Sequence, residues 1–235
     1  MARLYCGTSG FAYPSWKPDF YPAKAAQKDF LKHYAARLNA VEINYTFRQL
    51  PAASTLQKWV EATPAGFLFA CKAHQRITHI LRLQESEFTG AFFKAIDPLR
   101  SARRLGPVLF QLAPNFKRDV PLLAAFVEKL PGDLRYAFEF RHPSWLDAEV
   151  YRLLEKHRVS LCLAESDKLE IPRVITADFV YSRLRKGDYS AAERAEIQER
   201  VASLLSGGRD VYVFFKHEET AAGALYAEEL LNAPR

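Results

Sequence analysis

Cysteine is scarce in this sequence. Among its 235 residues, Cys6, Cys71 and Cys162 lie far apart and lack C-x-x-C spacing. Such spacing argues against both a disulfide framework and a zinc site, and it suits a reducing compartment. Apolar residues make up 49% of the chain, so a full core can be buried without disulfides or metals. We therefore expect a self-sufficient fold in the cytoplasm.

Long apolar runs are also missing. No stretch approaches the roughly 18 apolar residues that a membrane span requires. The first residues, Met1 to Cys6, lead directly into an expected strand and do not resemble a targeting signal. The sequence therefore predicts no membrane partner, and it gives no indication of an oligomeric state.

A dinucleotide-binding fingerprint is absent as well. No G-x-G-x-x-G follows any expected strand, and the turn from Gly7 to Gly10 has neither that spacing nor a following helix. We therefore expect no nucleotide cofactor. The backbone N–H groups of this glycine-rich turn can still face an anion.

The surplus of positive charge is small. Lys and Arg number 33 against 27 Asp and Glu, which gives a net charge of +6 and an isoelectric point near 9.2. A surplus spread along the chain is typical of ordinary surface solvation, although it weakly favours anionic partners. Nucleic acid is therefore an alternative partner and not the favoured one.

The chain does contain a strand followed by a helix, repeated without a low-complexity linker. Eight apolar segments are typical of parallel strands buried on both faces. They are 4–7, 41–45, 67–72, 108–112, 136–141, 159–165, 179–184 and 211–216. This pattern predicts one α/β domain, 1–235, folded as a single closed (β/α)8 TIM-type barrel, which typically needs about 250 residues. An open, doubly wound sheet is the alternative.

Several connecting helices have clear signals. Phe30, Tyr34 and Leu38 recur every four residues and form one apolar stripe. Ser190 and Glu193 form a capping-box pattern ahead of another stripe. These signals predict helices that pack on the outside of the barrel.

Two further connections differ from this regular pattern. Ser144, with Asp147 three residues later, has the spacing of a helix start and predicts a helix over 146–157. The segment 166–178 contains Pro172 and has no apolar stripe. We therefore expect a loop in place of the sixth helix.

The segment 136–141 has the most informative pattern of polar residues. Glu139 and Arg141 are two residues apart, so on a strand they point to one side, while Phe138 and Phe140 point to the other. Pro143 then resists continuation of the strand. Ligands bind at the carboxyl ends of strands in parallel α/β folds, so this pair marks the expected active face.

The other expected strands also end in polar residues. The set comprises Thr8, Ser9, Glu42, Asn44, Lys72, His74, Gln111, Glu139, Arg141, Glu165, Arg183, Lys216 and His217. In a barrel these side chains converge on one mouth and form a ligand site. The alternative is a buried ion network in which the two glutamates only neutralise the nearby cations. Tyr13 and Trp16, after the first strand, either line this mouth or pack as a loop plug.

Six segments resemble the YecE-like family, known as domain of unknown function 72. They are 7–11, 41–47, 69–73, 106–112, 138–145 and 181–185. The resemblance implies a TIM barrel in a cytoplasmic bacterial or archaeal protein and implies no established activity. The family pattern maps onto Glu42, Asn44, Lys72, Gln111, Glu139, Arg141, Trp145 and Arg183. Glu165, where Asp is more typical, and Lys216-His217, where Asn is common, depart from it.

The favoured function is that of an enzyme, such as a hydrolase or lyase, acting on a phosphorylated or otherwise anionic small substrate. Lys72, Arg141 and Arg183 would hold the anion. Glu139 and Glu42 would act as acid and base, their pKa values separated by unequal neighbours. The remaining candidates for contact with the substrate are Asn44, Gln111, Trp145, Tyr13, Trp16 and His217.

Two alternatives to this function remain. A metal-assisted phosphoesterase or sugar isomerase-like enzyme would place a divalent cation among Glu42, Glu139, Glu165 and His217, although few histidines converge there. A non-catalytic nucleic-acid binder would use the basic surplus and stack bases on the aromatic loop 11–16.

Overall fold

Eight parallel strands form the wall of a barrel. The computed structural model describes residues 1–216 and 220–234. The strands are β1 (Leu4–Thr8), β2 (Ala40–Ile43), β3 (Leu68–Lys72), β4 (Leu105–Gln111), β5 (Tyr136–Glu139), β6 (Ser160–Ala164), β7 (Phe179–Leu184) and β8 (Asp210–Phe215). Neighbouring strands pair in the order β1-β8-β7-β6-β5-β4-β3-β2. The predicted TIM-type barrel is therefore confirmed.

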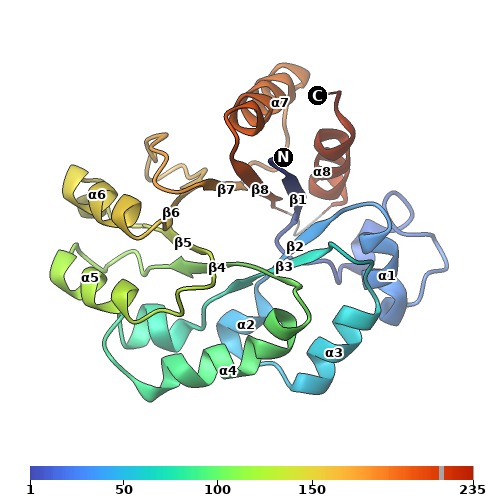
Figure 1. Cartoon of the computed structure of the whole chain (residues 1–235). Helices are drawn as coiled ribbons and strands as arrows, with labels where there is room; N and C mark the ends of the chain where they lie inside the picture. Colours follow the sequence, from blue (N-terminus) through green and yellow to red (C-terminus); the bar gives the residue numbers. More distant parts are fainter. Residues whose placement is uncertain (217–219, 235) are drawn as a thin grey trace.

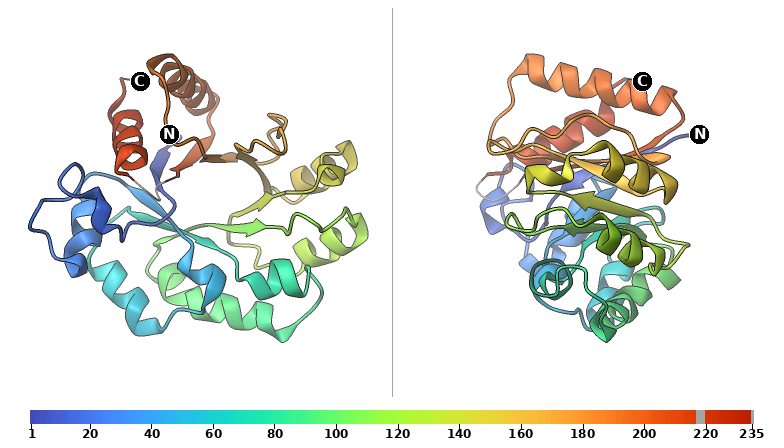
Figure 2. Two further views of the ribbon diagram at one scale, coloured as in Figure 1. Left: turned by 180° about the vertical axis from the view of Figure 1, so that it is seen from behind. Right: turned by 90° about the vertical axis from the view of Figure 1, so that its left-hand side faces the viewer.

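Helices cover the outside of this wall in every view (Figures 1 and 2). They are α1 (Phe30–Ala35), α2 (Tyr45–Arg48), α3 (Ala53–Glu61), α4 (Glu87–Ser101), α5 (Val120–Glu128), α6 (Ala148–Lys156), α7 (Ala191–Ser206) and α8 (Ala222–Asn232). Four short turns of helix accompany them, η1 (Pro14–Trp16), η2 (Gln27–Asp29), η3 (Arg76–Ile80) and η4 (Pro143–Trp145). No helix among the described residues is long and apolar enough to cross a membrane.

Side chains complete the closure of the barrel between β1 and β2. A single bridge, between Ser9 and Glu42, joins the backbones of these two segments. Asn39 accepts a hydrogen bond from the Cys6 N–H and donates one to Leu4 O, both at 2.8 Å. The described residues thus form a nearly closed barrel, and side-chain hydrogen bonds fasten its seam.

Tyr34 of α1 fastens the same seam from outside. Its hydroxyl accepts from the Thr8 N–H at 2.8 Å and donates to Ala40 O at 3.0 Å. A Cβ atom on Gly7 would lie 1.9 Å from Ala40 O, so only glycine permits this close approach. The apolar stripe that predicted α1 therefore also contains a residue that closes the barrel.

Of two predicted helix starts, the start of α7 is confirmed and the N-cap predicted for α6 is wrong. Ser190 and Glu193 form the predicted capping box at the start of α7. Asp147 is the N-cap residue of α6, and its side chain accepts from the Glu149 N–H. Ser144 lies in the preceding turn η4 and accepts from the Arg118 N–H, so its assignment as an N-cap is wrong. A 3-10 turn therefore separates β5 from its helix.

Five strands end earlier than predicted, β4, β6 and β8 by one residue and β2 and β5 by two. β5 ends at Glu139. β2 ends at Ile43 because Tyr45 already starts α2. The segment between β6 and β7, which the structure describes throughout, contains no helix. The loop expected in place of the sixth helix of the barrel, the one that would follow β6, is therefore confirmed. It lies between the helices labelled α6 and α7 in Figure 1.

An apolar cluster fills the inside of the barrel below the polar strand ends. It includes Ala70 of β3, Leu109 of β4, Ala137 of β5 and Tyr212 of β8. Lys72, Gln111 and Glu139 each follow a member of this cluster by two residues, so they face the same interior side of the sheet. The barrel floor is thus apolar and its carboxyl end is charged.

Candidate active site

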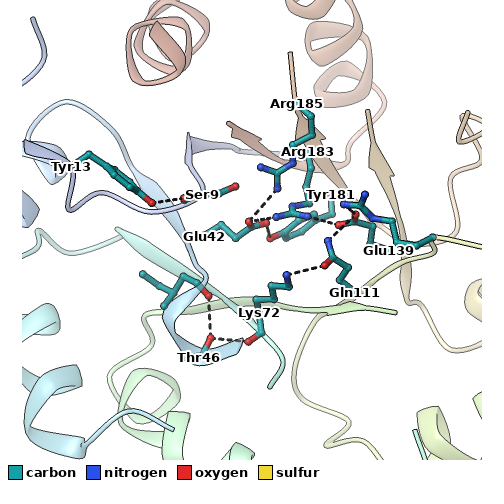
Figure 3. A network of polar contacts seen from close by, with 12 residues as sticks. Ser9, Tyr13, Glu42, Thr46, Lys72, Gln111, Glu139, Tyr181, Arg183 and Arg185 are labelled. Carbon is teal, nitrogen blue, oxygen red and sulfur yellow. Dashed lines mark hydrogen bonds and ion pairs between the residues drawn. The ribbon is translucent and has the colours of Figure 1, made fainter. Parts of the chain in front are cut away.

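A network of charged side chains occupies the carboxyl ends of the strands (Figure 3). Arg183 of β7 lies at its centre and is only 3% exposed. Its Nη2 atom donates to Glu42 Oε1 at 2.7 Å, and its Nη1 atom donates to Glu139 Oε2 at 2.5 Å. Arg183 therefore links β2 to β5 across the barrel, and both glutamates are fully buried.

Glu42 has two further partners from the β7 side. Tyr181 donates its hydroxyl to Glu42 Oε2 at 2.8 Å, and Arg185 Nη2 lies 3.6 Å from Glu42 Oε1. Tyr181, Arg183 and Arg185 follow one another at intervals of two residues, and all three side chains contact Glu42. Burial raises the pKa of Glu42, but Arg183 and Arg185 outweigh burial and lower it to about 2.

Glu139 is held in a similar way. Gln111 Nε2 donates to Glu139 Oε1 at 3.0 Å, and Arg141 forms an ion pair with the same oxygen. Burial raises the pKa of Glu139, but Arg183 and Arg141 outweigh burial and lower it. Both glutamates are therefore carboxylates at neutral pH. Their pKa values move in the same direction, contrary to the expectation that unequal neighbours would separate an acid from a base.

Lys72 of β3 completes the network and is 9% exposed. Its Nζ atom donates to Gln111 Oε1 at 2.9 Å and lies 3.9 Å from the ring centroid of Phe47. Burial and the nearby Arg183 lower the pKa of Lys72 to about 8, although Glu42 and Glu139 oppose this shift. Lys72 is therefore a network residue that can exchange a proton close to neutral pH.

Cations outnumber anions in this network. The cations are Lys72, Arg141, Arg183 and Arg185, and the anions are Glu42 and Glu139. With Lys72 protonated, four positive and two negative charges leave a net charge of +2. The buried atoms Arg141 Nε, Arg183 Nε and Arg185 Nη2 make no hydrogen bond within the described part of the chain. The network therefore keeps both charge and donors that the described side chains do not satisfy.

The two predicted amide residues have different surroundings. Gln111 lies between Lys72 and Glu139 and orients both, since its oxygen accepts from the amine and its nitrogen donates to the carboxylate. Asn44 follows β2 and precedes α2. Its Oδ1 atom is buried and has no hydrogen-bond partner among the residues described.

The predicted aromatic residues lie mostly outside the network. Trp145 is fully buried, stacks on Phe140 at 5.0 Å and donates to Phe116 O at 2.6 Å. Trp16 is also fully buried and packs inside its loop, which agrees with the plug interpretation. Tyr13 points toward Ser9 at the end of β1 and donates to its carbonyl oxygen at 3.4 Å (Figure 3).

The three described residues proposed for a metal-assisted enzyme, Glu42, Glu139 and Glu165, are not brought together as ligands. Glu165 accepts from the Tyr189 hydroxyl and from the Arg185 N–H, while Glu42 and Glu139 are paired with arginines. Within the described ranges, no group of three or more His, Cys, Asp or Glu residues is placed to hold a metal ion. His217 lies outside the described residues.

Two residues of the network were absent from the predicted site. Tyr181 and Arg185 both contact Glu42, at 2.8 Å and 3.6 Å. The signal was present in the sequence, because both residues are two positions from Arg183. Arg185 lies just beyond the last residue of β7, where strand periodicity no longer predicts direction safely.

A large cavity lies beside the network at the same end of the barrel. Its volume is about 970 Å³, and its lining includes Ala164 and Glu165 at the end of β6, Arg185 after β7, and Lys216 after β8. Residues of the loop between β6 and β7 form another part of the wall. Arg185 therefore belongs both to the charged network and to the cavity wall.

Comparison with known sequences identifies relatives whose names state no activity. The family model described as "Protein of unknown function DUF72" matches residues 5–235. The chain is 30% identical to the UPF0759 protein YunF of Bacillus subtilis over 155 residues, and 31% identical to the UPF0759 protein YecE of Escherichia coli over 144 residues. These alignments cover 63% and 60% of this chain but 54% and 50% of the relatives. The chain thus matches about half the length of these curated relatives.

Solved structures of similar proteins have the same fold. A DUF72 family protein of Thermotoga maritima has a TM-score of 0.84 and 28% identity, and the alignment covers 97% of each chain. Another, from Enterococcus faecalis, has a TM-score of 0.75 and 20% identity, with 100% of this chain and 99% of that chain covered. The second likeness is one of fold alone.

Proposed function

The chain belongs to the DUF72 family of proteins of unknown function, and from the chemistry of its own site we propose that it is an enzyme acting on a phosphorylated or otherwise anionic small substrate. The substrate would bind at the carboxyl end of the barrel, where the active sites of TIM barrels are found. The reaction would be of the acid–base kind used by lyases and hydrolases.

The observation that supports this proposal best is the uncompensated positive charge of the network. A buried ion network that serves stability alone pairs its charges and satisfies its donors, because an unpaired buried charge costs several kcal/mol. Here four cations face two carboxylates, and three buried guanidinium nitrogens have no hydrogen-bond partner within the described chain. A bound anion would supply the missing charge and acceptors.

The arginines divide between two roles in this proposal. Arg183 is engaged by the glutamates through both terminal nitrogens, so it would fix the site and not hold the substrate. Arg141 has a side chain that is 33% exposed, and that of Arg185 is 19% exposed. These two residues would therefore contact the anion, since guanidinium groups bind phosphate and carboxylate bidentately.

Lys72 is the residue we assign to proton transfer. A general acid or base works best when its pKa lies near the working pH, and the pKa of Lys72 is lowered to about 8. The lowered pKa values of Glu42 and Glu139 instead keep both carboxyls ionised. Their role would be to position Arg183, Arg141 and, through Gln111, the amine of Lys72.

Thermal unfolding in phosphate or sulfate, against chloride at matched ionic strength, tests the anion site. A ligand at a hundred times its dissociation constant adds about 2.7 kcal/mol to the free energy of unfolding, which raises the melting temperature measurably. Arg141→Ala should remove this rise. Arg100→Ala, which removes a surface arginine paired with Asp133, should retain it. Equal melting temperatures in all three salts, for wild type and both variants, would contradict the proposal.

A further inference from the structure

The cavity at the carboxyl ends of β6 and β7 occupies space that a helix between these two strands would otherwise cover. Leu163, Ser182 and Leu184 line it, and they alternate with interior residues such as Arg183, so they face the outside of the barrel wall. A volume of about 970 Å³ is at the upper end of the range for sites that bind small organic molecules. The loop thus leaves a ligand-sized space open to the active face.

Two guanidinium groups in this cavity have no ionic partner. Arg173 of the loop and Arg200 of α7 both line the wall, and neither has a hydrogen bond or ion pair with the residues that the structure describes. Burial lowers the pKa of Arg200 and the positive charge of Arg173 lowers it further, although the charges of Glu165 and Glu196 oppose this shift. The partly buried Arg200 and the exposed Arg173 thus line the same cavity from separate elements, and no described carboxylate forms an ion pair with either.

The acidic residues of the cavity wall form no ion pair with these two arginines among the described residues. Glu165 is already bound by the Tyr189 hydroxyl and by the backbone N–H groups of Arg185 and Lys186. Asp188 accepts from the Tyr226 hydroxyl. The remaining acids of the wall are exposed residues of the loop. Arg173 and Arg200 thus keep free donors for a ligand in the cavity.

Arg185 connects this cavity to the charged network. Its guanidinium approaches Glu42, and its buried Nη2 atom makes no hydrogen bond with any described residue. Arg185, which approaches Glu42 of the network, and Arg173 with Arg200 therefore line one and the same cavity.

We infer that the substrate carries two separated anionic groups, one bound by Arg141 and Arg185 at the barrel mouth and the other by Arg173 and Arg200 in the cavity. This inference rests on the proposed function, because the first of the two groups is the anion of that proposal. The substrate class is therefore an organic bisphosphate or a phosphorylated carboxylic acid, larger than a simple phosphate ester.

A series of probes of graded length tests the inference. Isothermal titration would compare methyl phosphate with α,ω-alkanediol bisphosphates whose chains grow by one carbon at a time. A bisphosphate that spans both sites gains charge-assisted hydrogen bonds, so one length should bind about 10- to 100-fold more tightly than methyl phosphate. Shorter and longer chains should bind less tightly than this optimum.

Variants separate this second subsite from the first. Arg200→Gln and Arg173→Gln should each remove the optimum and leave the affinity for methyl phosphate unchanged. Arg152→Gln, on the exposed face of α6, is the matched control and should keep the optimum. An affinity that does not depend on chain length, or an optimum that survives Arg200→Gln, overturns the inference while the mouth site stands. No binding of any probe overturns the proposed function as well.

Discussion

Arg183 determines the chemistry of the residues around it. It binds Glu42 and Glu139 together and holds both as carboxylates by lowering their pKa values against the effect of burial. Its positive charge also helps to lower the pKa of Lys72. Arg183, Arg141 and Arg185 together therefore keep the two glutamates ionised against the effect of burial, and burial together with Arg183 lowers the pKa of Lys72.

Lys72→Met should change how stability depends on pH. The pKa of Lys72 falls from 10.5 to about 8 on folding, so between these values the unfolded chain binds more protons than the folded one. In the wild type, Lys72 therefore adds to the free energy of unfolding above about pH 10.5, and this contribution is lost as pH falls through about 8. The change in the free energy of unfolding is about 3 kcal/mol.

Urea unfolding of wild type and Lys72→Met from pH 6 to pH 10 measures this contribution. The difference between the two proteins should grow in favour of wild type as pH rises above about 8. Because the comparison is between variants, the tyrosines and cysteines of the fold affect both curves alike. Parallel curves over the whole range would show that the pKa of Lys72 is not lowered.

At the scale of elements, the seam between β1 and β2 shows how the barrel closes. Other neighbouring strands pair through backbone ladders, whereas these two have one bridge and the side chains of Asn39 and Tyr34. Ser9 and Glu42 form that bridge, so the seam ends at the charged network. The geometry of Glu42 therefore depends on how the seam is held.

Tyr34→Phe should destabilise the fold without disturbing its packing. The change leaves the Thr8 N–H and Ala40 O buried without their partner, which should lower the free energy of unfolding by about 1–3 kcal/mol. Chemical unfolding measures this loss. Tyr45→Phe, at an exposed position on α2, is the control and should unfold at the wild-type urea concentration. Equal stability of both variants would mean that the hydroxyl does not fasten the seam.

The elements themselves could be predicted because their signals are local. Buried parallel strands appear as continuous apolar runs, and the capping box at Ser190 and Glu193 marks the start of α7 by itself. The predicted start of α6 lies too early in the chain because Ser144 and Asp147 both suit an N-cap. The structure selects Asp147, and Ser144 instead binds the N–H of Arg118, a residue distant in sequence.

At the scale of the whole molecule, the fold was more predictable than the site. Strand parity correctly brought together Glu42, Lys72, Gln111, Glu139 and Arg183, because alternation places such residues on one face. The direction of a loop aromatic depends on partners from elsewhere in the chain. Trp145 packs on Phe116 and Trp16 on Tyr34, so neither faces the mouth.

The arrangement of aromatics also bears on nucleic-acid binding. That alternative needed the loop 11–16 to present rings on which bases stack. Trp16 is fully buried, and Phe11 packs against Trp59 with its ring centroid 6.2 Å away. Trp16 is therefore not presented for stacking, and with Lys72 protonated the charged network contributes +2 to the chain's net charge of +6.

The central claim is that the charged network binds an anion and is not only a structural ion network. Glu139→Gln separates these two roles because it should lower the stability of the protein while it raises the positive charge of the site. Loss of the buried carboxylate should lower the free energy of unfolding by about 3–5 kcal/mol. It also releases Arg141 and raises the net charge of the site by one, so the affinity for an anion should increase.

The decisive measurement is the rise in melting temperature that phosphate produces over chloride, compared between Glu139→Gln and wild type. We expect the variant to melt lower than wild type in chloride and to show the larger rise in phosphate. A variant that melts lower than wild type, with no rise in phosphate over chloride for either protein, would mean that the network serves stability alone.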